Sequence, residues 1–129
     1  MIRTAYGDAR AYATKDGSEI RELMHPDVHG NRNQSIGEAT VPPGTATHPH
    51  RHRNAEELYH ICGGTGRMTL GKERFPVTAG DTVCIPPGTV HAIENTGDAA
   101  LTILCCCSPP YAHEDTELLP EPHDDGGVR

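Results

Sequence analysis

The chain has 129 residues, a length that suits one compact domain. Its formal net charge is −7 with nine neutral histidines, which argues against nucleic acid and anionic membranes as partners. Hydrophobic residues make up 35% and aromatic residues 4%, while 14 glycines and 11 prolines indicate many turns. This composition predicts an all-β protein with a modest, aliphatic core.

The predicted elements are short strands separated by turns. We expect strands at 18–24 and 34–41 with a polar loop over 25–33 between them, and an extended segment at 46–52 that returns as a strand at 57–62. A hairpin over 67–77 turns at Gly71 and Lys72, and strands follow at 82–85, 90–94 and 99–107. No helical period persists for three turns, so the pattern favours a sandwich or barrel.

The two ends of the chain differ in composition from the predicted barrel, which spans residues 18–108 as a single domain. Residues 1–17 read as an N-terminal arm and residues 109–129 as a C-terminal arm and acidic tail. We expect the acidic side chains of that tail to be solvated: Glu114, Asp115, Glu117, Glu121, Asp124 and Asp125. No 18-residue apolar run and no signal-peptide core is present, which predicts a cytoplasmic protein.

A group of potential metal ligands begins at His50 and His52. Residues i and i+2 of a strand point to the same face, with Cα atoms roughly 6.5–7 Å apart, so two imidazoles at this spacing can bind one ion. Glu57 starts the next strand across a tight turn, and His91 lies in a further strand. Three nitrogens and one oxygen would leave about two positions of a six-coordinate ion for water, substrate or dioxygen.

The spacing around these residues follows two motifs. Gly44, five residues, His50-x-His52, four residues, Glu57, six residues and Gly64 form the first. Gly80, five residues, Pro86-x-Gly88, two residues, His91, three residues and Asn95 form the second. With both motifs complete, the chain resembles the cupin superfamily over about residues 18 to 108.

The resemblance implies a small jelly-roll barrel, also called a double-stranded β-helix, that holds one divalent transition metal ion near its mouth. The implied metal ligands are His50, His52, Glu57 and His91. A homodimer is also implied. The ligand types suit iron, manganese, nickel, zinc or copper and do not select among them.

Other residues of the histidine-rich stretch, which spans residues 48–60, are expected to lie outside the site. Pro49 follows His48, and the motif gives His48 no role, so we place it on the rim. Glu56 and His60 have the opposite strand parity to Glu57. Glu56 is kept as the alternative ligand to Glu57, because the resemblance also tolerates a spacing of three residues between the second histidine and the glutamate. Arg51 and Arg53 alternate outward and are expected to be solvated.

The strand parity of other reactive side chains places some of them in the pocket. Tyr59 shares the parity of Glu57, so we predict a pocket position and a catalytic role for its hydroxyl. Cys105 and Cys107 share one face and Cys106 takes the other, so at least one thiol faces the interior. A cysteine buried at the end of an apolar strand mostly behaves as a small hydrophobic residue. The chain has five cysteines, three of them consecutive, and this odd, clustered count does not indicate a disulfide framework. Tyr111 and His113 follow the last strand and can cover the mouth.

The leading functional prediction is a metal-dependent enzyme that acts on a small organic molecule by dioxygenase-type oxidation or lyase chemistry. Glu57 could leave the metal and act as a base. Zinc would exclude oxygen activation and favour Lewis-acid isomerase chemistry. A non-catalytic barrel that binds a sugar or an acid is the alternative. A purely structural metal is the third reading, weakened because structural sites close their coordination with protein ligands.

Overall fold

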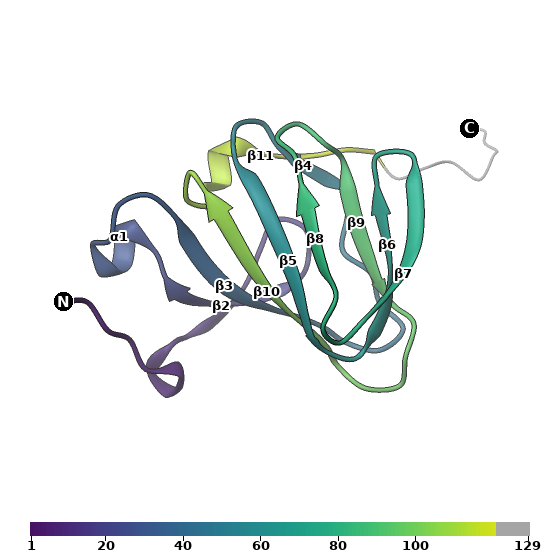
Figure 1. The fold of residues 1–129 in the computed structure, drawn as a ribbon, viewed down its shortest axis with the longest axis horizontal. Coiled ribbons are helices and arrows are strands. Elements are labelled where there is room, and N and C mark those ends of the chain that lie inside the picture. Colours follow the sequence, from purple (N-terminus) through teal and green to yellow (C-terminus); the bar gives the residue numbers. More distant parts are fainter. Residues whose placement is uncertain (121–129) are drawn as a thin grey trace.

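The computed structural model describes residues 1–120, which fold into two antiparallel β-sheets packed face to face (Figure 1). Sheet A has the order β1 (Ala11–Ala13), β2 (Glu19–Met24), β3 (Ser35–Val41), β10 (Leu101–Ser108), β5 (Glu56–Gly63), β8 (Thr82–Ile85). Sheet B has the order β11 (Thr116–Leu118), β4 (His50–His52), β9 (His91–Asn95), β6 (Thr65–Leu70), β7 (Glu73–Thr78). The architecture confirms the predicted all-β jelly roll.

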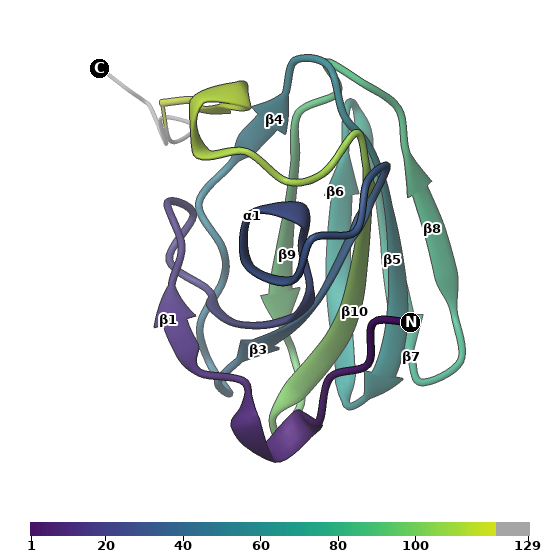
Figure 2. The ribbon, with the colours of Figure 1, turned by 90° about the vertical axis from the view of Figure 1, so that its left-hand side faces the viewer.

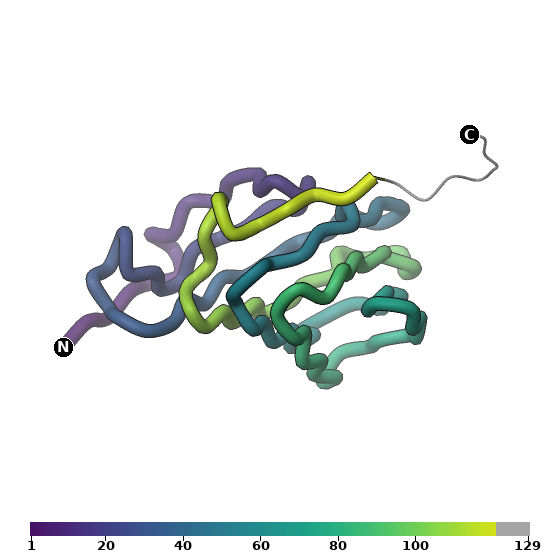
Figure 3. The backbone as a smooth tube through the Cα atoms, turned by 90° about the horizontal axis from the view of Figure 1, so that it is seen from above, coloured from purple at the N-terminus to yellow at the C-terminus, as the bar shows by residue number. Residues whose placement is uncertain are grey.

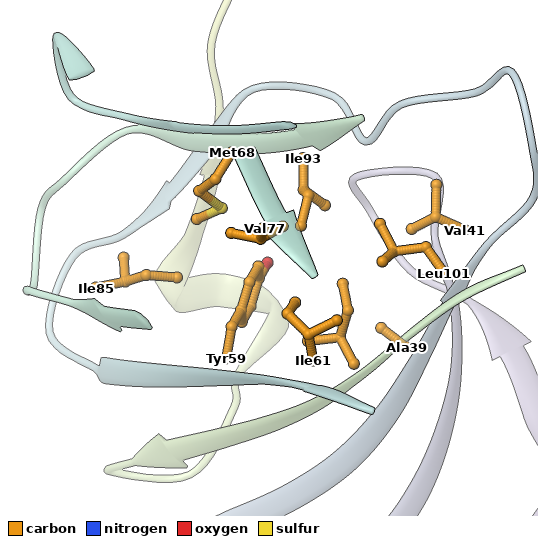
Figure 4. Close-up of a cluster of buried hydrophobic side chains, with 10 residues drawn as sticks. Ala39, Val41, Tyr59, Ile61, Met68, Val77, Ile85, Ile93 and Leu101 are labelled. Carbon is orange, nitrogen blue, oxygen red and sulfur yellow. The ribbon is translucent and has the colours of Figure 1, made fainter. Parts of the chain in front are cut away.

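Alternating burial along the strands places the core between the two sheets. Strand β3 alternates buried and half-buried side chains along its whole length, as a strand with one face on a core should. Figure 4 shows the core as mostly aliphatic side chains from both sheets around the ring of Tyr59. Its members are Ala39, Val41, Tyr59, Ile61, Met68, Val77, Ile85, Ile93, Leu101 and Ile103.

Part of the predicted polar loop at 25–33 is helical. The helix α1 (Pro26–His29) is one turn long, and the Asp27 amide donates a hydrogen bond to His25 Nδ1 at its start. Gly30 ends it with φ +84°, in the left-handed region that favours glycine. A single turn is too short for a helical period to show in the sequence. No helix among residues 1–120 is long and apolar enough to cross a membrane.

The arms at both ends of the chain add strands to the sheets. Strand β1 pairs with β2 at the edge of sheet A, and β11 pairs with β4 at the edge of sheet B. Figure 2 shows β1 and the C-terminal segment on the same side of the molecule, and Figure 3 shows that segment running beside the chain around β4. Lys15 Nζ donates hydrogen bonds to the carbonyls of His113 and Thr116, which ties the two arms together.

The prediction of a wholly solvated acidic tail is wrong for Asp115 and Glu117. The Asp115 carboxylate accepts hydrogen bonds from the backbone amides of Asn54 and Ala55, at 3.0 and 3.2 Å. Glu117 Oε1 lies 2.9 Å from Arg51 Nε, so Arg51 is paired instead of simply solvated. Both carboxylates find partners because β11 aligns them with the segment around β4, a long-range pairing that composition does not reveal. Glu114 is exposed.

The remaining acidic residues of the predicted tail, Glu121, Asp124 and Asp125, lie outside the described residues.

Candidate metal centre

Three strands bring the four predicted ligands together. His50 and His52 both point inward from β4, His50 pairs in register with His91 of β9, and Glu57 comes from the start of β5 in the other sheet. One potential ligand atom from each residue lies within 4.8 Å of the others, and all four side chains are buried. The group is therefore able to hold a metal ion.

The hydrogen bonds of the outer ring nitrogens fix the direction of each imidazole. Nδ1 of His50 lies 2.9 Å from the carbonyl oxygen of His48, and Nδ1 of His91 lies 3.0 Å from that of Thr89. A carbonyl only accepts, so both Nδ1 atoms carry the proton. Each neutral ring therefore turns a lone pair on Nε2 toward the centre.

His52 is held in the same way by a side chain of β11. Its Nδ1 lies 3.0 Å from Thr116 Oγ1, and that hydroxyl donates its own proton to the carbonyl of Ala112. The hydroxyl must then accept from His52 Nδ1, which leaves a lone pair on Nε2 of this ring as well.

The inward-facing atoms are acceptors without donors. Glu57 Oε1 lies 3.0 Å from His52 Nε2 and 3.4 Å from His91 Nε2. Among the described residues, Glu57 Oε1 and His91 Nε2 are buried side-chain atoms with no hydrogen-bond partner. Such contacts are favourable only with a proton or a metal cation between the atoms. Three imidazole nitrogens and a carboxylate oxygen fit a divalent transition metal ion.

The electrostatics favour the metal-binding forms of His50 and Glu57 but the protonated form of His52. Burial and the neighbouring charge of His91 lower the pKa of His50 to about 4, so this ring is neutral at pH 7. Burial raises the pKa of Glu57, but the imidazoles of His52 and His91 outweigh it and lower the pKa to about 2. Burial lowers the pKa of His52, but the Glu57 carboxylate outweighs it and raises the pKa above its ordinary value. A proton between His52 and Glu57 is therefore what a metal ion would displace.

Three of the four candidate ligands, His50, His52 and Glu57, form part of the wall of a cavity of about 50 Å³ inside the barrel. A water molecule needs only about 10–15 Å³ of such volume, so the cavity admits several waters or a small organic molecule. Three predicted pocket residues line it, namely Tyr59, Cys105 and Cys107. Burial raises the pKa of all three, which keeps the phenol and the two thiols neutral. Cys106 does not line the cavity, so it takes the face opposite to Cys105 and Cys107.

The C-terminal arm supplies a further wall of the cavity. Tyr111 lines the cavity, and the centroid of its ring lies 5.9 Å from that of His52. His113 is exposed and does not line the cavity, so only one of the two side chains expected to cover the mouth is placed there.

The residues of the histidine-rich stretch that were not expected to bind metal lie outside the ligand group. His48 Nε2 lies 2.7 Å from the carbonyl oxygen of Leu119. Glu56 and His60 are exposed on the outer face of β5, where His60 Nδ1 contacts the hydroxyl of Thr82. Arg53 is 61% exposed, as expected.

Asp16 is a cavity residue that the sequence reasoning missed. Its side chain is 10% exposed, and Oδ2 lies 3.4 Å from His50 Nε2. It comes from the turn between β1 and β2, 41 residues before Glu57 along the chain. The stretch Asp16-Gly17-Ser18 signals a tight turn, but nothing local indicates that the turn folds over the barrel. Thr116 was missed for the same reason.

Comparison with known proteins agrees with this geometry. The family model described as "Cupin domain" matches residues 37–107, and the chain belongs to this family. It is 53% identical over 119 residues to the uncharacterized protein MJ1618 of Methanocaldococcus jannaschii, covering 92% of this chain and 95% of that protein. It is 30% identical over 86 residues to an oxalate-binding protein of Thermotoga maritima, covering 67% of this chain and 71% of that protein.

A solved structure shows the same fold. The Lactobacillus farciminis oxalate decarboxylase in its formate complex superposes with a TM-score of 0.76 at 21% identity. The match covers 88% of this chain and 34% of that protein, so the chain spans about a third of the decarboxylase.

Proposed function

We propose that this protein is a divalent-metal-dependent enzyme that acts on a small organic molecule, by dioxygenase-type oxidation or lyase chemistry. The observation that supports this most is the buried group of potential ligand atoms from His50, His52, Glu57 and His91. Three of these residues, His50, His52 and Glu57, line a cavity. A structural ion would not need an adjoining cavity. When bound, a divalent ion supplies Lewis acidity, and a redox-active one can also exchange electrons with dioxygen.

The other residues of the site would bind the substrate and exclude water. Tyr59 is buried against His91, with ring centroids 5.8 Å apart, and burial raises the pKa of its hydroxyl well above the ordinary value. We therefore propose that Tyr59 acts as a neutral hydrogen-bond donor to the substrate. Glu57, with a pKa of about 2 beside its imidazoles, is a weak base there, so we assign it the role of ligand ahead of that of base.

The experiment is metal analysis followed by a turnover screen. The protein is purified without a histidine tag, its metals are measured, and oxygen consumption and product formation are followed with a panel of small acids, diketones and sugars. Bound iron, manganese or copper with oxygen uptake supports the oxygenase branch. Zinc with product but no oxygen uptake supports the lyase or isomerase branch.

His91→Ala tests the site and His60→Ala is its matched control, because His60 lies on the outer face of β5. We expect loss of metal in the first variant and full metal content in the second. Equal metal content in both variants would refute the site.

A non-catalytic binding role is the second candidate, favoured by the 30% identity to an oxalate-binding protein. This binding role predicts that the protein holds one metal ion per chain and binds one of the screened small molecules saturably, without turning it into a product. We also propose a cytoplasmic location and a homodimer, and both are compatible with the enzymatic and with the non-catalytic role.

A further inference from the structure

The charges around the cavity are acidic. Among the described residues that line it, Asp16, Glu22 and Glu57 carry carboxyl groups, and none is a lysine or an arginine. A divalent ion would balance two of the three carboxylates. The neutral tyrosines and thiols add no positive charge, so the open positions of the ion would be the single place among the described lining groups where an anionic ligand could meet a positive charge.

The basic side chains nearest in sequence are held elsewhere. Lys15 Nζ donates to the carbonyl of Thr116 at 2.8 Å. Arg21 Nη1 donates to the carbonyl of Ala9 at 2.8 Å, and its guanidinium lies over the ring of Tyr6. These contacts direct both cations to the backbone of the arms and leave the acidic lining of the cavity uncompensated.

One oxygen of Asp16 is fixed by the turn that carries it. Oδ1 accepts hydrogen bonds from the Thr14 hydroxyl at 2.6 Å and from the amide and hydroxyl of Ser18 at 2.9 and 2.7 Å. These three bonds hold the carboxyl group in one orientation, with Oδ2 on the side of His50.

The other oxygen of Asp16 is directed at an acceptor. Oδ2 faces Nε2 of His50, the ring nitrogen that carries the lone pair. Asp16 Oδ2 and His50 Nε2 are both acceptors and lie 3.4 Å apart, so a hydrogen-bond donor or a cation is needed beside them. The same is true of Glu57 Oε1, which has no hydrogen-bond partner. Asp16 is not one of the four residues whose ligand atoms lie within 4.8 Å of one another. Its Oδ2 is therefore placed to accept a hydrogen bond from a molecule that lies next to the ligand group.

We propose that the cavity selects small, uncharged, hydroxyl-bearing molecules, such as polyols or hydroxyketones, and that Asp16 sets this preference by accepting a hydrogen bond from a ligand hydroxyl. The inference rests on the proposed function and gives its substrate class. A hydroxyl satisfies Asp16 Oδ2, whereas a dicarboxylate brings two further negative charges beside Asp16 and Glu22 to a cavity whose described lining has no lysine or arginine to balance them. Asp16 acts here as a residue that determines specificity.

The test compares two probes on the manganese-loaded protein at one fixed pH. Dihydroxyacetone is the neutral probe and oxalate the anionic one, and binding is followed by calorimetry and by the manganese EPR signal. We expect dihydroxyacetone to bind and oxalate to bind at least tenfold more weakly. In Asp16→Asn, dihydroxyacetone should weaken and oxalate should strengthen, each at least tenfold. Asp27→Asn is the control, because the Asp27 side chain is 89% exposed.

Two further measurements distinguish failure of the proposed substrate class from misfolding of a variant and from absence of the metal. Glu22→Gln removes a cavity charge without removing a hydrogen bond to Asp16, so it should strengthen oxalate binding even if Asp16→Asn does not fold. Manganese content is measured first, since a protein that binds no metal contradicts the proposed function itself. A loaded protein that prefers oxalate, or that binds neither dihydroxyacetone nor glycerol, overturns the substrate class alone.

Discussion

At the scale of single residues, His52 is the ligand whose replacement should be most damaging. It contacts both Glu57 in the centre and Thr116 outside it. We expect His52→Ala to lose nearly all bound metal, because one imidazole of a convergent set carries a large share of the affinity. Metal content after dialysis measures this, with His60→Ala as the surface control. Retention of more than half of the wild-type metal content by His52→Ala would contradict the assignment.

Acid should weaken metal binding through His52 and not through Glu57. The pKa of Glu57 is about 2, so this carboxylate stays ionised in mild acid, whereas the pKa of His52 is raised and its ring gains a proton first. Metal must displace that proton, so affinity is full above the His52 pKa and falls below it by about tenfold per pH unit. Competition with a chelating dye between roughly pH 5 and 8 measures this. An affinity independent of pH would show that His52 is not a ligand.

The four ligands were predictable because their geometry is local and repeated. Strand parity puts His50 and His52 on one face, and Glu57 and His91 were assigned because their spacing matches the two cupin motifs. Asp16 and Thr116 were not predictable, since each reaches the site from an arm whose docking depends on long-range pairing. Parity also predicted that Tyr59 lines the pocket, as it does, and that Cys105 and Cys107 share a face, but it did not tell which face of that strand points into the cavity.

At the scale of elements, strand β11 should support the metal site from outside it. Thr116→Val removes the hydroxyl that accepts from His52 Nδ1 and keeps the side-chain shape. We expect metal affinity to fall about 10–100-fold, as when other outer hydrogen bonds to ligand histidines are lost. Thr82→Val is the matched control, because it removes a hydroxyl from His60, a histidine outside the ligand group. If both variants bind metal equally well, β11 has no such role.

The close pairing of β6 with β9 depends on the absence of a side chain at Gly66. A Cβ there would lie 2.7 Å from the carbonyl oxygen of Glu94 and 2.9 Å from Leu101 Cδ2, so the backbone must shift. We expect Gly66→Ala to destabilise the protein by about 1–3 kcal/mol, as overpacked cores do. Gly7→Ala is the control, since its Cβ would meet nothing within 4 Å. Urea denaturation of both variants measures the difference, and equal stabilities would contradict the packing.

The elements that the sequence did not reveal are very short. The turn of helix α1 and the strand β11 are each too short for a periodic pattern. The longer strands, such as β3 and β10, were predicted to within two residues, because alternation and flanking turns mark them.

At the scale of the whole molecule, the fold should outlast the loss of its metal. The core between the sheets is made of side chains other than the ligands, so the metal-free protein should still unfold cooperatively. Metal at a hundredfold excess over Kd adds about 2.7 kcal/mol, which corresponds to a Tm higher by on the order of 10 °C. Scanning calorimetry with and without chelator measures this. Loss of cooperative unfolding on chelation would make the metal a structural staple.

The contact between the two arms limits how far the chain can be shortened without damage to the site. A fragment limited to residues 37–107, the part that matches the family model, would keep all four ligands. It would lose the hydroxyl that orients His52, the carboxylate opposite His50, and the lysine that joins the arms. The smallest working unit is thus longer at both ends than the segment by which the family is recognised, and truncation from either terminus would damage the site from outside its ligands.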